Sequence, residues 1–233
     1  VRRLLSFVKP GVWEYEIEAE LMHEFLRNRS KGFAYTPIIA SGENANVLHY
    51  IANNMQCKDG DVILLDVGAE YANYSSDLTR MIPVNGKFTA RQKEIYNAVL
   101  DMKNFATSLL VPGNNWYDYH KECGEFYTSK FLELGLLDKA DVQNQDKNWP
   151  AYKKYMMHGT SHHLGLDTHD YGILKDKFVE NMVFTVEPGI YLPAEGFGVR
   201  IEDDLVIQNS GPAFNLMKNI PIEVEEIEEL MNS

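Results

Sequence analysis

The sequence predicts an α+β fold in which helices and antiparallel strands are mixed without the regular alternation of a parallel βαβ sheet. Three observations lead to this prediction. The chain has 233 residues, the length of one large domain. Some segments carry apolar residues at helical spacing, whereas others are short apolar runs typical of buried strands. The segments follow one another as helix, strand, hairpin, two helices, polar loop, two strands and final helix.

The first part of the chain is expected to hold one helix, a short strand and a hairpin. Residues 14–29 place apolar side chains on one helical face, behind Pro10-Gly11. A short strand is expected within residues 33–44. The run DVILLDVG at 61–68 is typical of a buried strand that ends in a single carboxylate. Residues 69–84 carry Tyr and Thr in a looser alternation, as the return strand of a hairpin does.

The second part is expected to begin with two helices. Thr89 and Gln92 form a capping-box pattern that opens the first of them. Residues 116–134 again carry apolar side chains at helical spacing. The remaining segments are predicted as a polar surface excursion, two strands and a short amphipathic helix, at residues 138–154, 181–192, 196–208 and 221–233.

Composition excludes several classes of protein. Lys and Arg total 22 against 34 Asp and Glu, and this net charge of −12 disfavours binding to nucleic acid, which needs clustered cations. No apolar run approaches the length of a membrane span, so no membrane partner is expected. Cys57 and Cys123 stand alone without a CxxC pair, which excludes a disulfide scaffold and fits the reducing cytoplasm. Because the chain starts VRRLL without Met, we expect a piece of a longer protein whose targeting signal would lie upstream.

Common catalytic motifs are missing from the sequence. It contains no GxGxxG, no Walker loop, no GxSxG and no HExxH. His158 and His162 are four residues apart, but the intervening Gly159, Thr160 and Ser161 are poor helix formers. A helical zinc-protease site is therefore excluded.

Four carboxylates stand in strand-like, apolar surroundings: Asp66, Asp77, Glu187 and Glu202. A hairpin would bring the first two together. Converging carboxylates repel one another and raise one another's pKa, and two divalent cations would neutralise four such charges. Oxygen ligands suit manganese and similar ions.

Simpler explanations remain open for each acid taken alone. An isolated Asp at a strand end is usually a turn former or half of an ion pair. Arg200 lies two residues from Glu202 and could neutralise it without a metal. We expect Asp203 and Asp204 to be solvated charges at a strand end.

Histidines strengthen the metal hypothesis. His23 and His120 lie in helical segments and are expected to be ordinary surface or packing residues. Four others lie between residues 158 and 169, in the run HGTSHHLGLDTH, a polar cluster that a hydrophobic core would not collect.

Several motifs in this order resemble those of the creatinase/methionine-aminopeptidase, or "pita-bread", metallopeptidases. They are DVG-x8-D at 66–77, HGTSHHLGLDTHD at 158–170, VEPGIY at 186–191 and RIEDD at 200–204. Within that superfamily they are most similar to Xaa-Pro aminopeptidases and prolidases. The resemblance implies a pita-bread fold, a curved antiparallel sheet flanked by helices with pseudo-twofold halves. It also implies that residues 1–233 form a single catalytic domain without the N-terminal domain usual in these enzymes.

The resemblance further implies a dinuclear metal site with five ligands: Asp66, Asp77, His162, Glu187 and Glu202. The two metals would share Asp77 and Glu202. His49, His158 and His169 match histidines that face the substrate or support the site, and Arg200 matches a supporting arginine. The expected cofactor is two divalent cations, with manganese first and cobalt or zinc as alternatives.

By the same resemblance, the expected activity is hydrolysis of the bond between an N-terminal residue and a following proline. A hydroxide bridging the metals would attack, and Glu187 would relay a proton to the proline nitrogen. The expected partners are proline-containing peptides, and the full-length protein is expected to form a homo-oligomer. Two alternatives stay open: a prolidase, which cleaves only Xaa-Pro dipeptides, and a non-catalytic module that binds peptides or partners.

Overall fold

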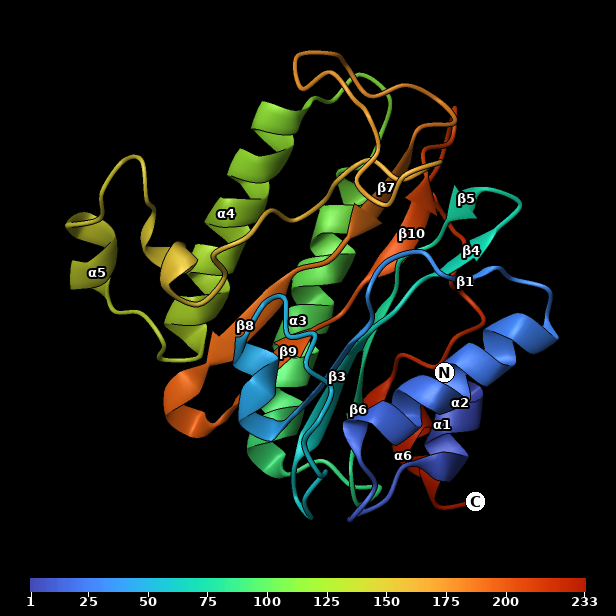
Figure 1. Ribbon diagram of the computed structural model, residues 1–233. Coiled ribbons are helices and arrows are strands. Elements are labelled where there is room, and N and C mark those ends of the chain that lie inside the picture. Colours follow the sequence, from blue (N-terminus) through green and yellow to red (C-terminus); the bar gives the residue numbers. More distant parts are fainter.

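A computed structural model describes residues 1–233, and its elements confirm the α+β prediction (Figure 1). The helices are α1 (Arg2–Phe7), α2 (Glu14–Arg27), α3 (Ala90–Ser108), α4 (Trp116–Glu133), α5 (Lys139–Gln143) and α6 (Val224–Met231). The strands are β1 (Gly32–Phe33), β2 (Ile38–Ser41), β3 (Val62–Asp66), β4 (Ala69–Tyr71), β5 (Tyr74–Ser75), β6 (Thr79–Pro83), β7 (Val183–Val186), β8 (Gly189–Leu192), β9 (Phe197–Arg200), β10 (Asp203–Val206) and β11 (Phe214–Asn215). Three short 3₁₀ turns complete the set: η1 (Gly42–Asn46), η2 (Ala151–Lys154) and η3 (Pro193–Glu195).

Two antiparallel half-sheets position the ends of four strands opposite one another. In the first, β3 lies between β2 and β6, and Asp66 pairs with Thr79. In the second, β10 lies between β11 and β7, and Asp203 pairs with Val186. The backbone N–H of Glu202 donates to the carbonyl of Thr79 at 3.1 Å, which joins the two half-sheets at this point.

The hairpin predicted for residues 69–84 is only partly correct. Only β6, at its end, returns along β3. The preceding residues form a separate hairpin, β4–β5, which pairs with β1. Its two-residue turn, Ala72-Asn73, has positive φ angles of 52° and 71°, the backbone conformation that a tight hairpin requires.

The two strands predicted at 181–192 and 196–208 are each divided in two. Pro188 has no N–H to donate, so the ladder of β7 ends before it. The other break falls between β9 and β10, where the N–H of Glu202 turns toward β6. As a result β7 pairs with β10, whereas β8 pairs with β9.

Helices were predicted more accurately than strands. Thr89 and Gln92 form the expected capping box of α3, and Ile95, Val99 and Met102 on one face of that helix are buried. α3 contacts α4, strand β7 and the β8–β9 pair, while α1, α2 and α6 lie together near both chain termini (Figure 1). One continuous core of 47 buried side chains extends from Leu4 to Ile227.

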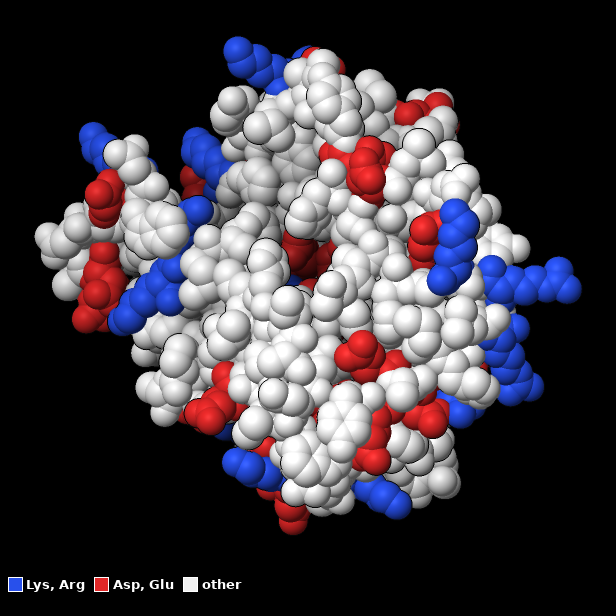
Figure 2. All heavy atoms as spheres, viewed as in Figure 1, with Lys and Arg blue, Asp and Glu red and all other residues white.

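Other predictions concern the surface. Residues 138–154 are largely exposed, as expected, and α5 projects away from the body of the molecule (Figure 1). None of the helices combines the length and the apolar character needed to cross a membrane. In the middle of the face shown in Figure 2, a hollow is ringed by uncharged side chains, and acidic side chains lie deep inside it.

Candidate metal centre

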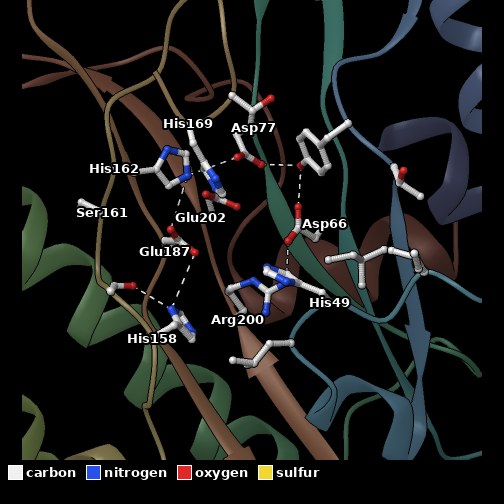
Figure 3. A pocket seen from close by; sticks show the side chains of 17 residues that line it. His49, Asp66, Asp77, His158, Ser161, His162, His169, Glu187, Arg200 and Glu202 are labelled. Atoms are coloured by element: carbon white, nitrogen blue, oxygen red, sulfur yellow. Dashed lines mark hydrogen bonds and ion pairs between the residues drawn. The ribbon is translucent and has the colours of Figure 1, made fainter. Parts of the chain in front are cut away.

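A cavity of about 620 Å³ lies where the two half-sheets meet, a size typical of small-ligand sites. It collects the sequence-predicted site residues that were dispersed over more than 150 positions of the chain. All nine line it: His49, Asp66, Asp77, His158, His162, His169, Glu187, Arg200 and Glu202 (Figure 3).

The strand ends place the four acids. Asp66 ends β3, and Asp77 lies two residues before the start of β6, the partner of β3. Glu187 directly follows β7, and Glu202 directly precedes β10, the partner of β7. Each half-sheet therefore delivers two carboxylates from one antiparallel pair, which accounts for the similar sequences LLDVG and TVEPG at the ends of β3 and β7.

Close approach of the chain at Gly68 makes this placement feasible. A Cβ atom there would lie 1.8 Å from the carbonyl oxygen of Ser76 and 2.7 Å from the ring of Tyr35. Any larger residue would push apart the segments that carry Asp66 and Asp77. Glycine is required here for space, because its φ angle is not in the left-handed region.

The histidine segment runs alongside β7 without forming a helix, as the sequence predicted. His162 accepts from the N–H of Thr185 through its carbonyl at 3.0 Å, and Thr160 accepts from the N–H of Glu187 at 2.8 Å. From behind, α4 anchors the segment, because Tyr127 donates to Thr160 at 3.0 Å and the Tyr119 hydroxyl lies 2.7 Å from that of Ser161.

Three of the predicted ligands form a tight group. One ligand atom from each of Asp77, His162 and Glu202 lies within 4.8 Å of the other two. Nδ1 of His162 lies 2.9 Å from the carbonyl of His163, to which it donates, so Nε2 is the nitrogen directed into the cavity. Nε2 lies 3.5 Å from both Asp77 and Glu187 (Figure 3).

Asp66 is held differently from the other acids. One of its oxygens accepts from Arg200 at 2.5 Å, and the other accepts from the hydroxyl of Tyr35 at 2.5 Å. The same hydroxyl contacts Asp77, so Tyr35 links the two aspartates. The suggestion that Arg200 neutralises Glu202 is therefore wrong. Arg200 pairs with Asp66, because β3 packs against β9, the strand that ends in Arg200.

The cavity holds four carboxylates, and Arg200 is the only Lys or Arg side chain there to balance them. Burial, followed by the charges of Asp77 and Glu187, raises the pKa of Glu202 well above its usual range. Burial likewise raises the pKa of Glu187 to about 7, although His162 and Arg200 oppose this. Burial alone would lower the pKa of His162, but its contact with Asp77 and the charge of Glu187 raise it to about 9. These groups hold protons near neutral pH that a bound cation would displace.

His158 belongs to a separate hydrogen-bonded chain. Burial and the nearby Arg200 lower the pKa of His158 to about 3, so its ring is neutral. Nδ1 donates to the carbonyl of Gly159 at 2.7 Å, which leaves Nε2 to accept from the Tyr191 hydroxyl at 2.7 Å. That hydroxyl in turn accepts from Arg200 at 2.7 Å. His158 also places Nδ1 3.8 Å from Glu187.

The two remaining histidines lie at the rim. His49 and His169 are both exposed at the cavity wall. The ring of His169 packs edge-on against that of His162, with centroids 4.4 Å apart. His23 is exposed, and His120 stacks on Trp116, so both are the surface or packing residues that the sequence predicted.

The prediction for Asp203 and Asp204 is wrong, because both are buried. Asp203 forms ion pairs with Arg80 at 2.5 Å and with Lys103. Asp204 accepts from the N–H of Asp77 at 3.1 Å, and burial raises its pKa to about 8. Their strand lies inside the sheet between β7 and β11, which sequence alternation did not reveal.

Two contributors to the site were missed at the sequence level. Tyr35 lies in no recognisable pattern, so no signal was available for it. Tyr191 stands four residues after Glu187 in the quoted VEPGIY motif. That motif drew attention only to the acid, although it already contained the tyrosine that contacts His158 and Arg200.

The donor set fits divalent cations. Four carboxylates and one imidazole nitrogen converge on the cavity, and Arg200 is the only Lys or Arg that lines it. Hard or borderline ions with mixed oxygen and nitrogen ligands, such as manganese, suit this set.

Comparison with known proteins agrees with the geometry. A family model described as metallopeptidase family M24 matches residues 1–209. A Xaa-Pro aminopeptidase from Haemophilus influenzae is 42% identical over 99% of this chain, and a mouse Xaa-Pro dipeptidase is 35% identical over the same share. The structure of zinc-substituted Escherichia coli aminopeptidase P in complex with product superimposes over 99% of this chain, with a TM-score of 0.91 and 38% identity.

These similarities confirm the pita-bread fold that the sequence motifs implied. The chain spans only about half the length of the relatives it matches: 56% of the Haemophilus protein, 55% of the mouse dipeptidase and 55% of the Escherichia coli structure.

Proposed function

The chain belongs to metallopeptidase family M24, and from that membership we propose that it is a metal-dependent aminopeptidase acting on peptides whose second residue is proline. It would hydrolyse the bond between the first residue and the proline. Two kinds of support combine here. Relatives at 42% and 40% identity carry the name Xaa-Pro aminopeptidase. The observation that carries the proposal is the convergence of four carboxylates and the free Nε2 of His162 on one cavity with a single arginine.

We propose five residues as metal ligands: Asp66, Asp77, His162, Glu187 and Glu202. Asp77 and Glu202 lie between the other three and would serve both of two divalent ions. Manganese is the proposed ion, with cobalt and zinc as alternatives, and a pair of bound cations supplies Lewis acidity and an activated water. The group of Asp77, His162 and Glu202 within 4.8 Å supports this assignment.

Glu187 is the proposed proton carrier. As a deprotonated carboxylate in the cavity, it would take a proton from the attacking water and deliver it to the departing proline nitrogen. His158 is proposed to support the site beside this carboxylate: its neutral ring is held by the Gly159 carbonyl and Tyr191, with Nδ1 3.8 Å from Glu187.

Arg200 and the rim histidines have supporting roles in the proposal. Arg200 balances Asp66 and links it through Tyr191 to His158. His49 and His169, which line the cavity, would donate N–H groups to the carbonyl oxygen of the bond that is cleaved, and so stabilise the negative charge that develops there.

Residues 1–233 are proposed to act as one catalytic domain, because a single core runs through them. The two buried, unpaired cysteines support the proposed cytoplasmic location. Assembly into a homo-oligomer stays a prediction.

A peptide assay with metal control tests this function. The chain, supplied with Mn²⁺, should release the first residue from an Xaa-Pro-Xaa tripeptide and lose that activity in excess EDTA. Elemental analysis of the purified chain should show up to two divalent ions. Absence of cleavage at any metal concentration would contradict the enzyme assignment and favour a peptide-binding module.

Prolidase is the second candidate, because the mouse Xaa-Pro dipeptidase is 35% identical over nearly the whole chain. The same assay separates the two. Cleavage of an Xaa-Pro dipeptide together with no cleavage of the tripeptide would favour prolidase.

A further inference from the structure

Glu14 is a buried acid that none of the metal-site motifs includes. It lies in the first turn of α2, its exposed surface is 0%, and no Lys or Arg lies within ion-pair distance of it. A buried carboxylate without a cation is costly unless hydrogen bonds replace its water. Hydrogen bonds must therefore stabilise the Glu14 carboxylate.

Five donors surround this carboxylate. Oε1 accepts from the N–H of Ser41 at 2.8 Å, from the Ser41 hydroxyl at 2.6 Å and from the Asn44 amide at 3.2 Å. Oε2 accepts from the Tyr50 hydroxyl at 2.7 Å and from the N–H of Met55 at 2.9 Å. Hydrogen bonds to a charged acceptor are about twice as strong as those between neutral groups.

All five donors come from one segment, residues 41–55. It begins at the end of β2 and passes through η1, and it forms no strand. Between Asn44 and Met55, the segment carries Leu48, His49 and Ile51, which line the cavity beside the proposed metal site. Ile51 is 58% exposed, so apolar burial does not fix this part of the segment.

Glu14 contacts both ends of the segment that forms one wall of the cavity, and it contacts none of the proposed ligands. We propose that Glu14 is a positioning residue that fixes residues 41–55, and through them His49 and Ile51, at the mouth of the cavity. The catalytic consequence rests on the proposed function, but the structural consequence does not. The carboxylate acts as a clamp: without it, the segment loses five hydrogen bonds and keeps those that Asn53 makes with Pro37 and Ile39.

The experiment uses the Glu14→Gln variant. Glutamine keeps the shape of the glutamate side chain, but its NH₂ group would face the N–H and O–H groups that donate to Glu14. Hydrogen exchange of residues 42–55 should accelerate about tenfold or more, since charged hydrogen bonds of about 1.5–3 kcal/mol are lost, while exchange in β3 and β6 stays unchanged. Mn²⁺ affinity should stay within about twofold. The value of kcat/KM for an Xaa-Pro-Xaa peptide should fall about tenfold or more.

Coupling to His49 separates positioning from general damage. If Glu14 acts through the segment, His49→Ala should cost much less in the Glu14→Gln background than in the parent chain. Tyr50→Phe removes only one donor and should change the same exchange rates by a smaller factor. Glu20→Gln is the matched control, because Glu20 lies on the same helix and pairs with Arg3, outside the segment.

Opposite outcomes would overturn the proposal. Unchanged exchange in residues 42–55 would show that other contacts hold the wall. Acceleration throughout the chain, or loss of Mn²⁺ affinity in parallel, would show that Glu14 supports the whole fold instead. If the parent chain cleaves no Xaa-Pro peptide, the proposed function fails, and the exchange rates still decide the role of Glu14.

Discussion

Glu202 and Asp203 are neighbours at the start of one strand and equally buried, with 1% and 0% of their surfaces exposed, but their surroundings are opposite. Asp203 meets two cations, Arg80 and Lys103, and the amide of Asn215 at 2.8 Å. The Glu202 carboxylate accepts only from the Thr79 hydroxyl, at 2.7 Å, and faces other carboxylates. Where the chain supplies its own cations the acid is structural, and where it does not the acid is available to a metal.

The two regions are also linked mechanically. The Arg80 guanidinium that pairs with Asp203 donates to the backbone carbonyls of Thr79 at 2.9 Å and Glu202 at 2.6 Å. It therefore holds the junction of the half-sheets from which Glu202 enters the cavity. The Arg80–Asp203 ion pair therefore supports the junction that carries Glu202, whose own charge no Lys or Arg neutralises.

Removing one unbalanced acid should have the largest effect on activity and little effect on the fold. Asp77→Asn is expected to abolish peptide cleavage and weaken Mn²⁺ binding below detection by calorimetry. The unfolding free energy in EDTA should stay the same or rise, because like-charge repulsion is relieved. Retention of both metal and turnover would refute the ligand assignment.

Removing the balanced acid should do the reverse. Asp203→Asn leaves Arg80 and Lys103 buried without a counterion and should lower the unfolding free energy by about 3–5 kcal/mol, with or without metal. Urea unfolding in EDTA measures this loss. Equal stability of variant and parent would break the distinction between the two acids.

The two regions should differ in their response to pH. In the metal-free chain His162, with a pKa of about 9, contributes stability below its unfolded value near 6.5 and loses it as pH rises through 9. The stability that Glu187 contributes also falls as pH rises, up to about pH 7. The reason is that its raised pKa favours the protonated folded form. The pKa of Asp203 is lowered by its cations, so its contribution is already complete above pH 4 and stays constant.

Thermal unfolding in EDTA should therefore show stability falling by on the order of 1–3 kcal/mol between pH 6.5 and 9. With Mn²⁺ the trend should reverse, because metal binding requires deprotonated ligands. A flat profile in EDTA would contradict the account of the unbalanced acids.

The smallest effect is expected from a group that touches neither a proposed ligand nor the structural cluster. Tyr191→Phe removes the hydroxyl between His158 and Arg200 and should lower kcat/KM about tenfold, with Mn²⁺ affinity unchanged within about twofold. Tyr96→Phe is the matched control, because the Tyr96 hydroxyl donates to the Ile222 carbonyl, in contact with no residue of the cavity. An equal loss in both variants would remove Tyr191 from the site.

Local patterns account for what sequence reasoning predicted well. The capping box and the periodic apolar face of α3 act within a few turns, so the sequence alone located that helix. The acids at the ends of β3 and β7 were visible for the same reason, because each interrupts an apolar run. The break between β9 and β10 was missed, since the N–H of Glu202 bonds to a residue 123 positions away.

Sequence by itself determined the α+β class, the helices α2, α3, α4 and α6, the identity of the acids and histidines that line the cavity, and the family they resemble. Only the tertiary structure decided which acids are neutralised. The sequence predicted Asp203 and Asp204 to be solvated charges, whereas Arg80 reaches Asp203 from 123 residues away. The environment of a charge is set by segments that meet only on folding, because burial and ion pairing depend on distance in space, whereas a sequence pattern records only distance along the chain.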